Sequence, residues 1–564
     1  GGYRRFWGIS FIERGGGHTM RSHWAWGRAA DEPTIADQDG LAAMLHRRLG
    51  WDDLAPSTAV AVRDLALPRP RVAVPGSLAQ MASTDVRDRA QHAYGRSYRD
   101  VARAHAGRFD HPPEAVLRPS SRPEVASILE WAGDADVAVI PYGGGSSVCG
   151  GVEPDVGGPA VSVDLEALSG LLELNTTDRA AHFAAGTYGP AVNEALRPHG
   201  LTLRHFPQSF EFSTVGGWVA TRAGGHFATG PTHIDDFVES ITMETPAGPW
   251  ESRRLPGSGA GPSPDRLVLG SEGSLGIICD AWLRVQPRPA YRASASVGFA
   301  AMTDAVDALR ALAQSGLWPS NCRLLDPLEA LLAGTDVPGG SGAVLIVGFE
   351  GADHPLDQPL HRALALCRDF SGVVDDEGVS IRHDPAVPDA EGASSGRAGA
   401  EEAWRSSFLR APYRRDALIA LGAVIETFET ACLWSRFAET DAALRAGLQA
   451  AMAEAGLDGI VSMRITHAYP DGLAPYYTVL ARPIGDRPTS ASERVDRWDM
   501  VKAASMEVID AQRATATHHH AVGRDHRPAY DRQRPQLFAE ALAAVKGRLD
   551  PNGVMNPGVL IGPA

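Results

Sequence analysis

The chain has 564 residues, of which 44% are hydrophobic and 21% charged, the composition of a globular protein long enough for several domains. Its formal net charge of -15 argues against nucleic acid as a partner, because phosphate backbones are bound by basic surfaces, although a locally basic pocket is compatible with it. The five cysteines are scattered and never spaced CxxC, which argues against a disulfide framework or a zinc site and fits a reducing cytoplasm. The sequence has no apolar stretch of about 18 residues, so no membrane-spanning helix is predicted.

The N-terminal part begins with a segment that we leave out of the fold. YRRFWGISF is superficially similar to a twin-arginine signal, but Glu13, Arg14 and several glycines interrupt the apolar stretch. We therefore interpret residues 1–19 as an extension that precedes Met20. Residues 20–110 are predicted to be mainly helical, because LAAMLHRRLGW and DRAQHAYGRSYRDVARAH both show the apolar spacing of an amphipathic helix.

From Pro112 onward the pattern changes to short strands. VAVIPY reads as a buried strand that opens into a glycine loop, and AVSVDLEAL, LLELN, AHFAAGTYG and IICDAWLRVQPRP alternate as strands do. Pro287 and Pro289 mark a boundary, after which strands such as AVLIVGFEG and IVSMRITHAY alternate with helices and indicate a second α/β domain. The small polar segment 388–402 is predicted to be mobile. A helix, LFAEALAAVKGRL, and a turn-rich tail, DPNGVMNPGVL, end the chain.

Three glycine-rich segments lie between Pro141 and Asp280: PYGGGSSVCGG, STVGGWVATRAGG and LGSEGSLGIICD. Residues without side chains let a pyrophosphate approach the backbone closely, and free N–H groups then bind the anion. The segments match neither the Rossmann fingerprint nor a Walker motif. Each alone could be a structural turn, but three together suit an extended dinucleotide.

The order of these segments, followed by DPNGVMNPG, resembles the flavoproteins of the vanillyl-alcohol oxidase superfamily, and more closely the alkyldihydroxyacetonephosphate synthase family. The similarity also includes CRLLD, PYRRD, ETFETACLW, RITHAYPDGLAPYY and HHHAVGR, and it extends from Trp24 to Val559. It implies an α+β fold: a two-subdomain FAD-binding domain of the PCMH type and an α/β cap domain for the substrate, with a helical N-terminal region and a C-terminal tail. Gly230-Pro231 and the insertion around 383–402 depart from the family pattern.

On this basis we predict four parts after the extension. They are the N-terminal region at 20–110, the FAD-binding domain at 111–289, the cap domain at 290–520, and a C-terminal segment at 521–564 that returns to the flavin.

The resemblance implies FAD as cofactor, and we expect it to be non-covalent, with Cys149 a candidate for a covalent link only in principle. The expected FAD contacts lie in and beside the glycine segments. They are Pro141, Tyr142, Gly143, Gly144, Gly145, Ser146, Ser147, Gly150, Pro207, Ser209, Ser213, Thr214, Gly216, Gly217, Ala220, Thr221, Gly224, Glu272, Gly273, Gly276 and Ile277.

His518, His519 and His520 are the sharpest local feature. Neighbouring side chains on an extended segment point to opposite faces, so three consecutive histidines do not readily converge on one ion, and we predict no metal site. An imidazole pKa near 6.5 suits proton transfer or, in the neutral form, hydrogen bonding. The resemblance implies that this triplet lies in the active site.

Tyr476 matches the family's catalytic tyrosine, although a tyrosine in an apolar strand is more often part of the core. With an ordinary pKa of about 10 it is a poor base unless cations or imidazoles lower that value, and the histidines could do so. Arg415 matches the family's phosphate contact, with an ion pair to Asp416 as the competing interpretation. Arg323 matches an active-site arginine, and Arg524 replaces a family lysine; salt bridges are the competing interpretation for both.

The resemblance implies an exchange without net oxidation, as in ether-lipid synthesis. Flavin N5 would attack the ester-bearing carbon of acyl-dihydroxyacetone phosphate, Tyr476 would help to remove a proton, the fatty acid would leave, and a fatty alcohol would displace the flavin. The expected partners are these lipid substrates. They are compatible with a homodimer, and with a cytoplasmic protein that contacts a membrane peripherally. The first alternative is a FAD-linked dehydrogenase or oxidase of a 2-hydroxy acid or alcohol, which would not require the triplet, Tyr476 and PYRRD together. The second is a non-catalytic flavin or ligand carrier, against which the clustered titratable groups argue.

Overall fold

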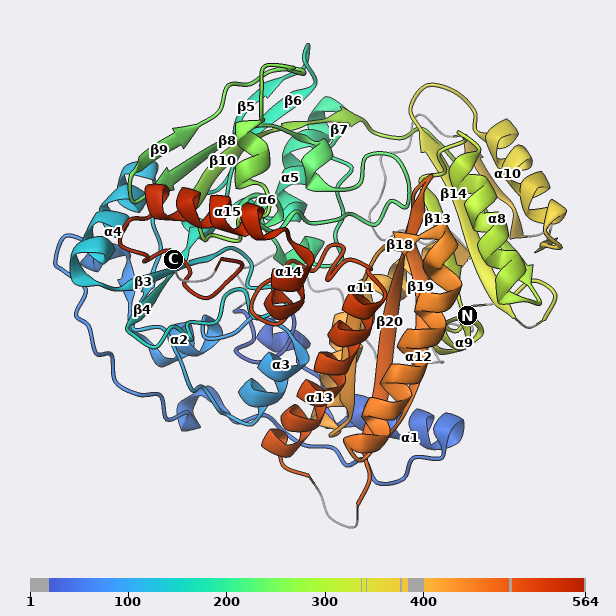
Figure 1. The fold of residues 1–564 in the computed structure, drawn as a ribbon, viewed down its shortest axis with the longest axis horizontal. Coiled ribbons are helices and arrows are strands. Elements are labelled where there is room, and N and C mark those ends of the chain that lie inside the picture. The colour runs from blue at the N-terminus through green and yellow to red at the C-terminus, as the bar shows by residue number, and fades with distance from the viewer. Residues whose placement is uncertain are drawn as a thin grey trace.

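The computed structural model describes residues 20–561 apart from 336, 341, 376–377, 384–399 and 486–488. The extension at 1–19 and most of the polar segment at 388–402 therefore lie outside the described residues. The described residues form three larger β-sheets and a two-stranded ribbon, and two of the larger sheets lie in one half of the molecule while the third forms the other half (Figure 1).

The N-terminal region is less helical than the sequence predicts. Its α-helices are α1 (Ile35–Leu49), α2 (Val86–Gln91) and α3 (Tyr98–His105). Residues 50–85 contain only short 3-10 turns and a two-residue strand. The helix expected around residues 88–105 is interrupted between α2 and α3, where the backbone N–H of Arg96 donates to the carbonyl of Ser147 at 2.6 Å. A Cβ on Gly95 would lie 2.3 Å from the same oxygen, so the break lets this segment pass against the first glycine loop.

The first half contains two sheets around one core. The first sheet has the order β1-β2-β4-β3, and β2, β4 and β3 are parallel. The second has the order β5-β6-β10-β8-β9 and is antiparallel. The strands are β1 (Ala82–Ser83), β2 (Val116–Leu117), β3 (Ala138–Tyr142), β4 (Ala160–Asp164), β5 (Leu171–Asn175), β6 (Ala180–Ala184), β8 (Val238–Thr245), β9 (Gly248–Glu251) and β10 (Ile277–Arg284).

The helices of this half are α4 (Arg122–Ala135), α5 (Gly189–Leu196), α6 (Val215–Thr221) and α7 (Pro264–Val268), and β7 (Leu201–Thr202) pairs with β11 (Gln286–Pro287). The first glycine loop follows β3, the second contains α6, and the third precedes β10. Because β3 and β10 belong to sheets that share a hydrophobic core, the three segments meet at one edge of this half.

The second half is built on a nine-stranded sheet, and all its strand pairings between described residues are antiparallel. Its main path runs β15-β12-β14-β13-β19-β20-β17, with β16 beside β12 and β18 beside β20. The strands are β12 (Tyr291–Phe299), β13 (Asn321–Leu325), β14 (Ala343–Gly351), β15 (Val373–Val374), β16 (Ser380–His383), β17 (Val424–Glu429), β18 (Cys432–Leu433), β19 (Leu457–Ala468) and β20 (Gly472–Pro483).

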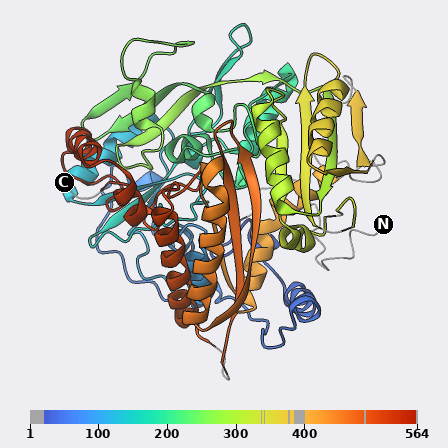
Figure 2. The same cartoon turned by 45° about the vertical axis from the view of Figure 1, so that its right-hand side comes forward.

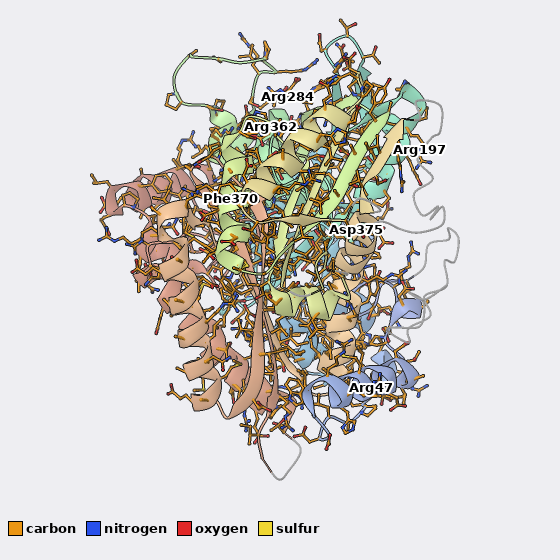
Figure 3. The ribbon with its side chains drawn as sticks, turned by 90° about the vertical axis from the view of Figure 1, so that its right-hand side faces the viewer. Arg47, Arg197, Arg284, Arg362, Phe370 and Asp375 are labelled. Atoms are coloured by element: carbon orange, nitrogen blue, oxygen red, sulfur yellow. The ribbon has the colours of Figure 1, made fainter. Side chains whose placement is uncertain are left out.

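Four helices, α8 (Met302–Gln314), α10 (Asp357–Asp369), α12 (Phe437–Glu454) and α13 (Ala491–Ala511), pack along this sheet, and two more, α9 (Pro327–Ala333) and α11 (Ala400–Ala420), approach the first half. Figure 2 shows the long β19–β20 hairpin between α12 and α8. In the side view of Figure 3, Arg362 marks α10 on the near face of the sheet, and Arg47 marks α1 at the lower right of the molecule. Tyr477 of β20 donates to Asp441 of α12 at 2.9 Å, so the preceding Tyr476 faces the opposite side of the sheet.

The C-terminal segment returns to the first half. After α14 (Arg527–Gln533) and α15 (Gln536–Leu549), the tail runs beside β3, where Val139 and Asn556 each donate a backbone hydrogen bond across the pair. The Lys546 ammonium bonds the Asp550 carboxylate and the carbonyls of Ser274 and Met555, which fixes the tail beside the third glycine segment. Among the described residues, no helix is both long enough and apolar enough to cross a bilayer.

Candidate active site

A cavity of about 400 Å³ lies where the two halves meet. One side is formed by the three glycine segments, and the other by β13, β17, β19, β20, α9 and α11 of the second half. Trp26 and α1 close part of it from the N-terminal region. Residues that are far apart in the sequence therefore face one space.

The glycine side of the cavity consists largely of backbone. A Cβ on Gly144 would lie 1.7 Å from the carbonyl oxygen of Phe212, and one on Gly143 would lie 2.5 Å from Thr214 Oγ1. A Cβ on Gly216 would lie 2.7 Å from that of Ala185. Only glycine at these positions permits such close packing of the first segment against residues 212–214 and of the second segment against Ala185, and the result is a wall of backbone and small side chains. A wall of this kind fits the pyrophosphate of FAD.

The expected FAD contacts line the cavity with two exceptions. Gly150 lies on the side of the first loop that faces Arg524, where a Cβ would be 3.5 Å from the Cβ of Arg524. Ile277 is fully buried, whereas Ile278 lines the cavity. Ile277, an expected FAD contact, therefore does not line the cavity, and its neighbour Ile278 does, since side chains alternate along β10.

The histidine triplet is wrapped around a buried carboxylate that sequence reasoning missed. Glu429, at the end of β17, accepts the backbone N–H groups of His518 (2.6 Å), His519 (2.8 Å) and His520 (2.9 Å). It also accepts the hydroxyl of Thr517 at 2.7 Å. Burial by itself raises the pKa of Glu429, but the three histidines and these N–H donors hold it well below 4.5, so the group is a carboxylate anion.

A second buried carboxylate holds the residues that follow. Glu272, in the third glycine segment, accepts the N–H groups of Val522 (2.8 Å) and Gly523 (2.7 Å), and burial raises its pKa to about 7. Glu272 thus lines the cavity as predicted, but its carboxylate binds the protein. The loop 517–523 is fixed by one acid from each half of the molecule.

This loop is bent rather than extended, so its backbone differs from the one assumed in the argument against a metal site. Within the described residues, each group of ligand atoms close enough for one ion contains two histidines of the triplet, and none contains all three. The Nδ1 atoms of His518 and His519 lie 2.9 Å apart, and one ring nitrogen each of His467, His518 and His519 lie within 4.8 Å of one another. These rings also bond to neighbours: His518 Nε2 to the Tyr469 hydroxyl at 2.6 Å and His467 Nε2 to the Gly225 carbonyl at 3.0 Å.

Two of the three histidines line the cavity. His519 and His520 do so, whereas His518 lies behind them against Tyr469. Burial lowers the pKa of His519 to about 3 and that of His520 to about 4, although Glu429 opposes the shift. Both imidazoles are therefore neutral near pH 7 and act as hydrogen-bonding groups. The thiol of Cys149 donates to the His520 carbonyl at 3.1 Å, and Cys149 does not line the cavity.

Tyr476 lies in the cavity wall between two charged neighbours on adjacent strands. Its register partners are Glu429 on β17 and Arg464 on β19. The Arg464 guanidinium carbon lies 3.9 Å from the centroid of the tyrosine ring. The ring centroid of His520 is 5.5 Å away, nearly perpendicular. Burial raises the pKa of Tyr476, and Arg464 opposes that shift.

Arginines of the second half give the cavity a basic wall. Arg323, Arg414, Arg415 and Arg464 all line it, and Glu329 is the acidic residue among them. Arg415 donates to Asp416 (3.0 and 2.8 Å) and to the Arg96 carbonyl (2.6 Å), so the competing ion-pair interpretation is confirmed, yet the residue still faces the cavity. Arg323 donates to the carbonyl of His226.

Arg524 does not line the cavity. Its guanidinium donates to the carbonyls of Glu153 (3.2 Å) and Pro557 (2.9 Å), which joins the first glycine loop to the C-terminal tail. The structure therefore does not bring Arg524 to the predicted substrate position, because its side chain is directed into the scaffold behind the loop.

One end of the cavity is apolar. Leu41, Met44 and Leu45 of α1, Leu332 of α9 and Leu418 of α11 line it. Sequence reasoning missed this group, although α1 was predicted as an amphipathic helix. Such a wall accommodates a hydrocarbon chain.

Comparison with known proteins agrees with this arrangement. Residues 113–252 match the family described as FAD binding domain, and residues 288–560 match FAD linked oxidases, C-terminal domain. The chain is 28% identical over 504 residues to alkyldihydroxyacetonephosphate synthase of Trypanosoma brucei brucei, covering 85% of this chain and 78% of that protein. It is 27% identical over 469 residues to the mitochondrial D-lactate dehydrogenase [cytochrome] of Arabidopsis thaliana, covering 80% and 74%. A solved alkyldihydroxyacetonephosphate synthase structure superposes with a TM-score of 0.73 at 22% identity, covering 92% of each chain.

Proposed function

The chain belongs to the FAD-dependent flavoprotein family that includes the alkyldihydroxyacetonephosphate synthases, and on that premise we propose that it exchanges the acyl group of acyl-dihydroxyacetone phosphate for a fatty alcohol. The observation that carries the proposal is the composition of one cavity. It joins a glycine wall that fits FAD to a basic wall suited to a phosphate and an apolar end suited to a hydrocarbon chain.

Each wall has a task in this exchange. FAD, when bound, supplies an electron sink for carbon chemistry. Arg323, Arg414 and Arg415 bind and orient the phosphate, and the leucines at the apolar end hold the acyl or alkyl chain. His519 and His520, neutral near pH 7, hydrogen-bond the substrate oxygens. We assign movement of the substrate proton to the phenolic oxygen of Tyr476.

The net reaction balances without an external oxidant. The bond between the ester-bearing carbon and the ester oxygen breaks, and that carbon forms a new bond to the oxygen of the alcohol. The fatty acid leaves as a carboxylate, and the alcohol proton passes to solvent. The division at 111–289 and 290–520, with the C-terminal segment returning to the flavin, remains our proposal for the domain boundaries.

A redox function on a 2-hydroxy acid is the second candidate, favoured by the likeness to D-lactate dehydrogenase. The apolar end of the cavity argues against it, because a short hydroxy acid leaves Leu41, Met44 and Leu418 without a ligand to contact.

We also propose that the protein docks on a membrane surface through the apolar end. Ile35, Leu331 and Leu409 lie on α1, α9 and α11, the helices that form this end, and they are 44%, 51% and 42% exposed. Lipid substrates could then enter without crossing water. A homodimer stays a prediction.

Anaerobic absorption spectra of the FAD-loaded protein test the proposal. Acyl-dihydroxyacetone phosphate should perturb the flavin spectrum, and adding a fatty alcohol should release fatty acid and form the ether. A Tyr476→Phe variant should keep FAD and lose turnover. Bleaching by D-lactate or another hydroxy acid, with no response to the acyl substrate, would establish the redox alternative instead.

A further inference from the structure

We propose that Arg464 is an active-site residue that promotes proton exchange at the Tyr476 hydroxyl and offers a hydrogen bond to an anionic oxygen of the substrate. This inference rests on the proposed function, in which Tyr476 moves the substrate proton. The sequence suggested that the histidines could lower the pKa of Tyr476, and this inference assigns that role to the positive charge of Arg464.

The first argument is position. Arg464 and Tyr476 are directly paired across β19 and β20, and both line the cavity. The guanidinium carbon lies 3.9 Å from the centroid of the phenol ring, a separation typical of a cation stacked on an aromatic face. A positive charge at this distance favours the phenolate over the phenol.

The second argument is the charge of the surrounding groups. Within the described part of the chain, Tyr476 is faced by Thr427 and Glu429 from β17, Arg464 from β19, and His519 and His520 from the loop 517–523. Glu426 acts from the opposite face of β17, where it is paired with Lys502 at 2.7 Å. The two glutamates oppose formation of a phenolate, and Thr427 offers a neutral hydrogen bond. The two histidines are neutral near pH 7, since burial lowers the pKa of His519 to about 3 and that of His520 to about 4. Arg464 is therefore the cation among the groups that face Tyr476.

The third argument is that Arg464 is held in place but has a donor to spare. Glu329 of α9 accepts one N–H of Arg464 at 2.8 Å, and Ser462 donates to the other oxygen of the same carboxylate at 2.6 Å. Arg464 is 8% exposed, and its buried Nε–H has no hydrogen-bond partner among the described residues. An unpaired buried donor in a cavity wall is costly unless a ligand completes it. A phosphate or carbonyl oxygen of the substrate is the matching acceptor.

The test measures ionisation of Tyr476 directly, without substrate. The FAD-loaded wild type and the Arg464→Gln and Arg464→Lys variants are each compared with the same protein carrying Tyr476→Phe. The difference in tyrosinate absorbance during a pH titration then reports Tyr476 alone. Arg464→Gln should move the midpoint upward by about one to three pH units, and Arg464→Lys should retain most of the wild-type value, because it keeps the charge. FAD content and circular dichroism show that each variant is folded.

Arg482→Gln is the matched control, because Arg482 lies on β20 and forms ion pairs with Asp53 and Asp458 away from the cavity. It should leave the Tyr476 midpoint unchanged. A midpoint that does not respond to Arg464→Gln, or that responds instead to His519→Gln, overturns the proposal.

The kinetic readout separates this inference from the proposed function. If the exchange occurs, the rising limb of kcat/KM against pH should move to higher pH in Arg464→Gln by the same amount as the titration midpoint. If no exchange occurs while the midpoint still shifts, the proposed function fails and the role of Arg464 in Tyr476 ionisation stands.

Discussion

Replacing Glu429 by glutamine should destabilise the loop that carries the histidine triplet. The carboxylate accepts three backbone N–H groups and one hydroxyl in a fully buried position. Hydrogen bonds to a charged group contribute about 1.5–3 kcal/mol each, and neutral ones about 0.5–1.5 kcal/mol. If the amide oxygen takes the place of Oε1, the three hydrogen bonds from Thr517, His519 and His520 each weaken by about 1 kcal/mol. The amide –NH₂ then faces the His518 N–H, and this contact between two donors costs about 1–3 kcal/mol. Relief from burying a charge offsets part of this, which leaves a net loss of about 2–4 kcal/mol.

Hydrogen exchange of the FAD-loaded protein measures this loss of stability at the individual amides of the loop. The amides of His518, His519 and His520 should exchange roughly 30- to 1,000-fold faster in Glu429→Gln, which is the same free energy expressed as a ratio. Glu439→Gln is the control, because that residue is 61% exposed and forms a 3.4 Å surface pair with Arg436. The pKa of Glu429 is lowered in the fold, so its contribution is present above the unfolded value of 4.5 and is lost as the pH falls through the folded value. Unchanged exchange of all three amides near neutral pH would refute the reasoning.

Three further predictions concern the same site. Burial lowers the pKa of His519 to about 3 and that of His520 to about 4, from an unfolded value of 6.5. The free energy of unfolding should therefore fall as the pH drops from 6.5 towards 4, by up to about 1.4 kcal/mol per pH unit for each ring. In thermal melts, His519→Gln and His520→Gln should show a weaker dependence of melting temperature on pH than wild type, and an identical dependence would contradict the lowered pKa values. Gly144→Ala should abolish FAD binding in a flavin-fluorescence titration, because its Cβ would lie 1.7 Å from a carbonyl oxygen, whereas Gly547→Ala, in a helix with nothing within 4 Å, should bind normally. Arg524→Ala should weaken FAD binding and leave the KM for the acyl substrate unchanged, because the guanidinium bonds the carbonyls of Glu153 and Pro557 behind the first glycine loop. A raised KM with normal FAD affinity would instead support a role of Arg524 in substrate binding.

The part of the site that could be predicted from the sequence is the part set by local pattern. The buried strand before Gly143 and the absence of side chains in the loop are properties of neighbouring residues. The alternation along β10 is also local, but its register relative to the cavity is not, and Ile277 was expected where Ile278 lines the cavity. Arg464 and Glu429 are different, because they reach Tyr476 only through the pairing of β19, β20 and β17. One signal was available for Glu429: the strand VIETFE places charges in an apolar setting, where an acid needs donors.

The histidine triplet shows why the remaining part depends on the folded chain. An extended backbone would have separated the three rings, but Glu429 gathers their N–H groups and bends the segment around one carboxylate. Glu272, which belongs to the other half of the molecule, accepts the N–H groups of Val522 and Gly523 farther along the same loop. Because one acid belongs to the glycine wall and the other to the nine-stranded sheet, the loop 517–523 links the two walls of the cavity. The distance between the FAD wall and Tyr476 therefore depends on both carboxylates, and a change at either should alter flavin binding and proton transfer together.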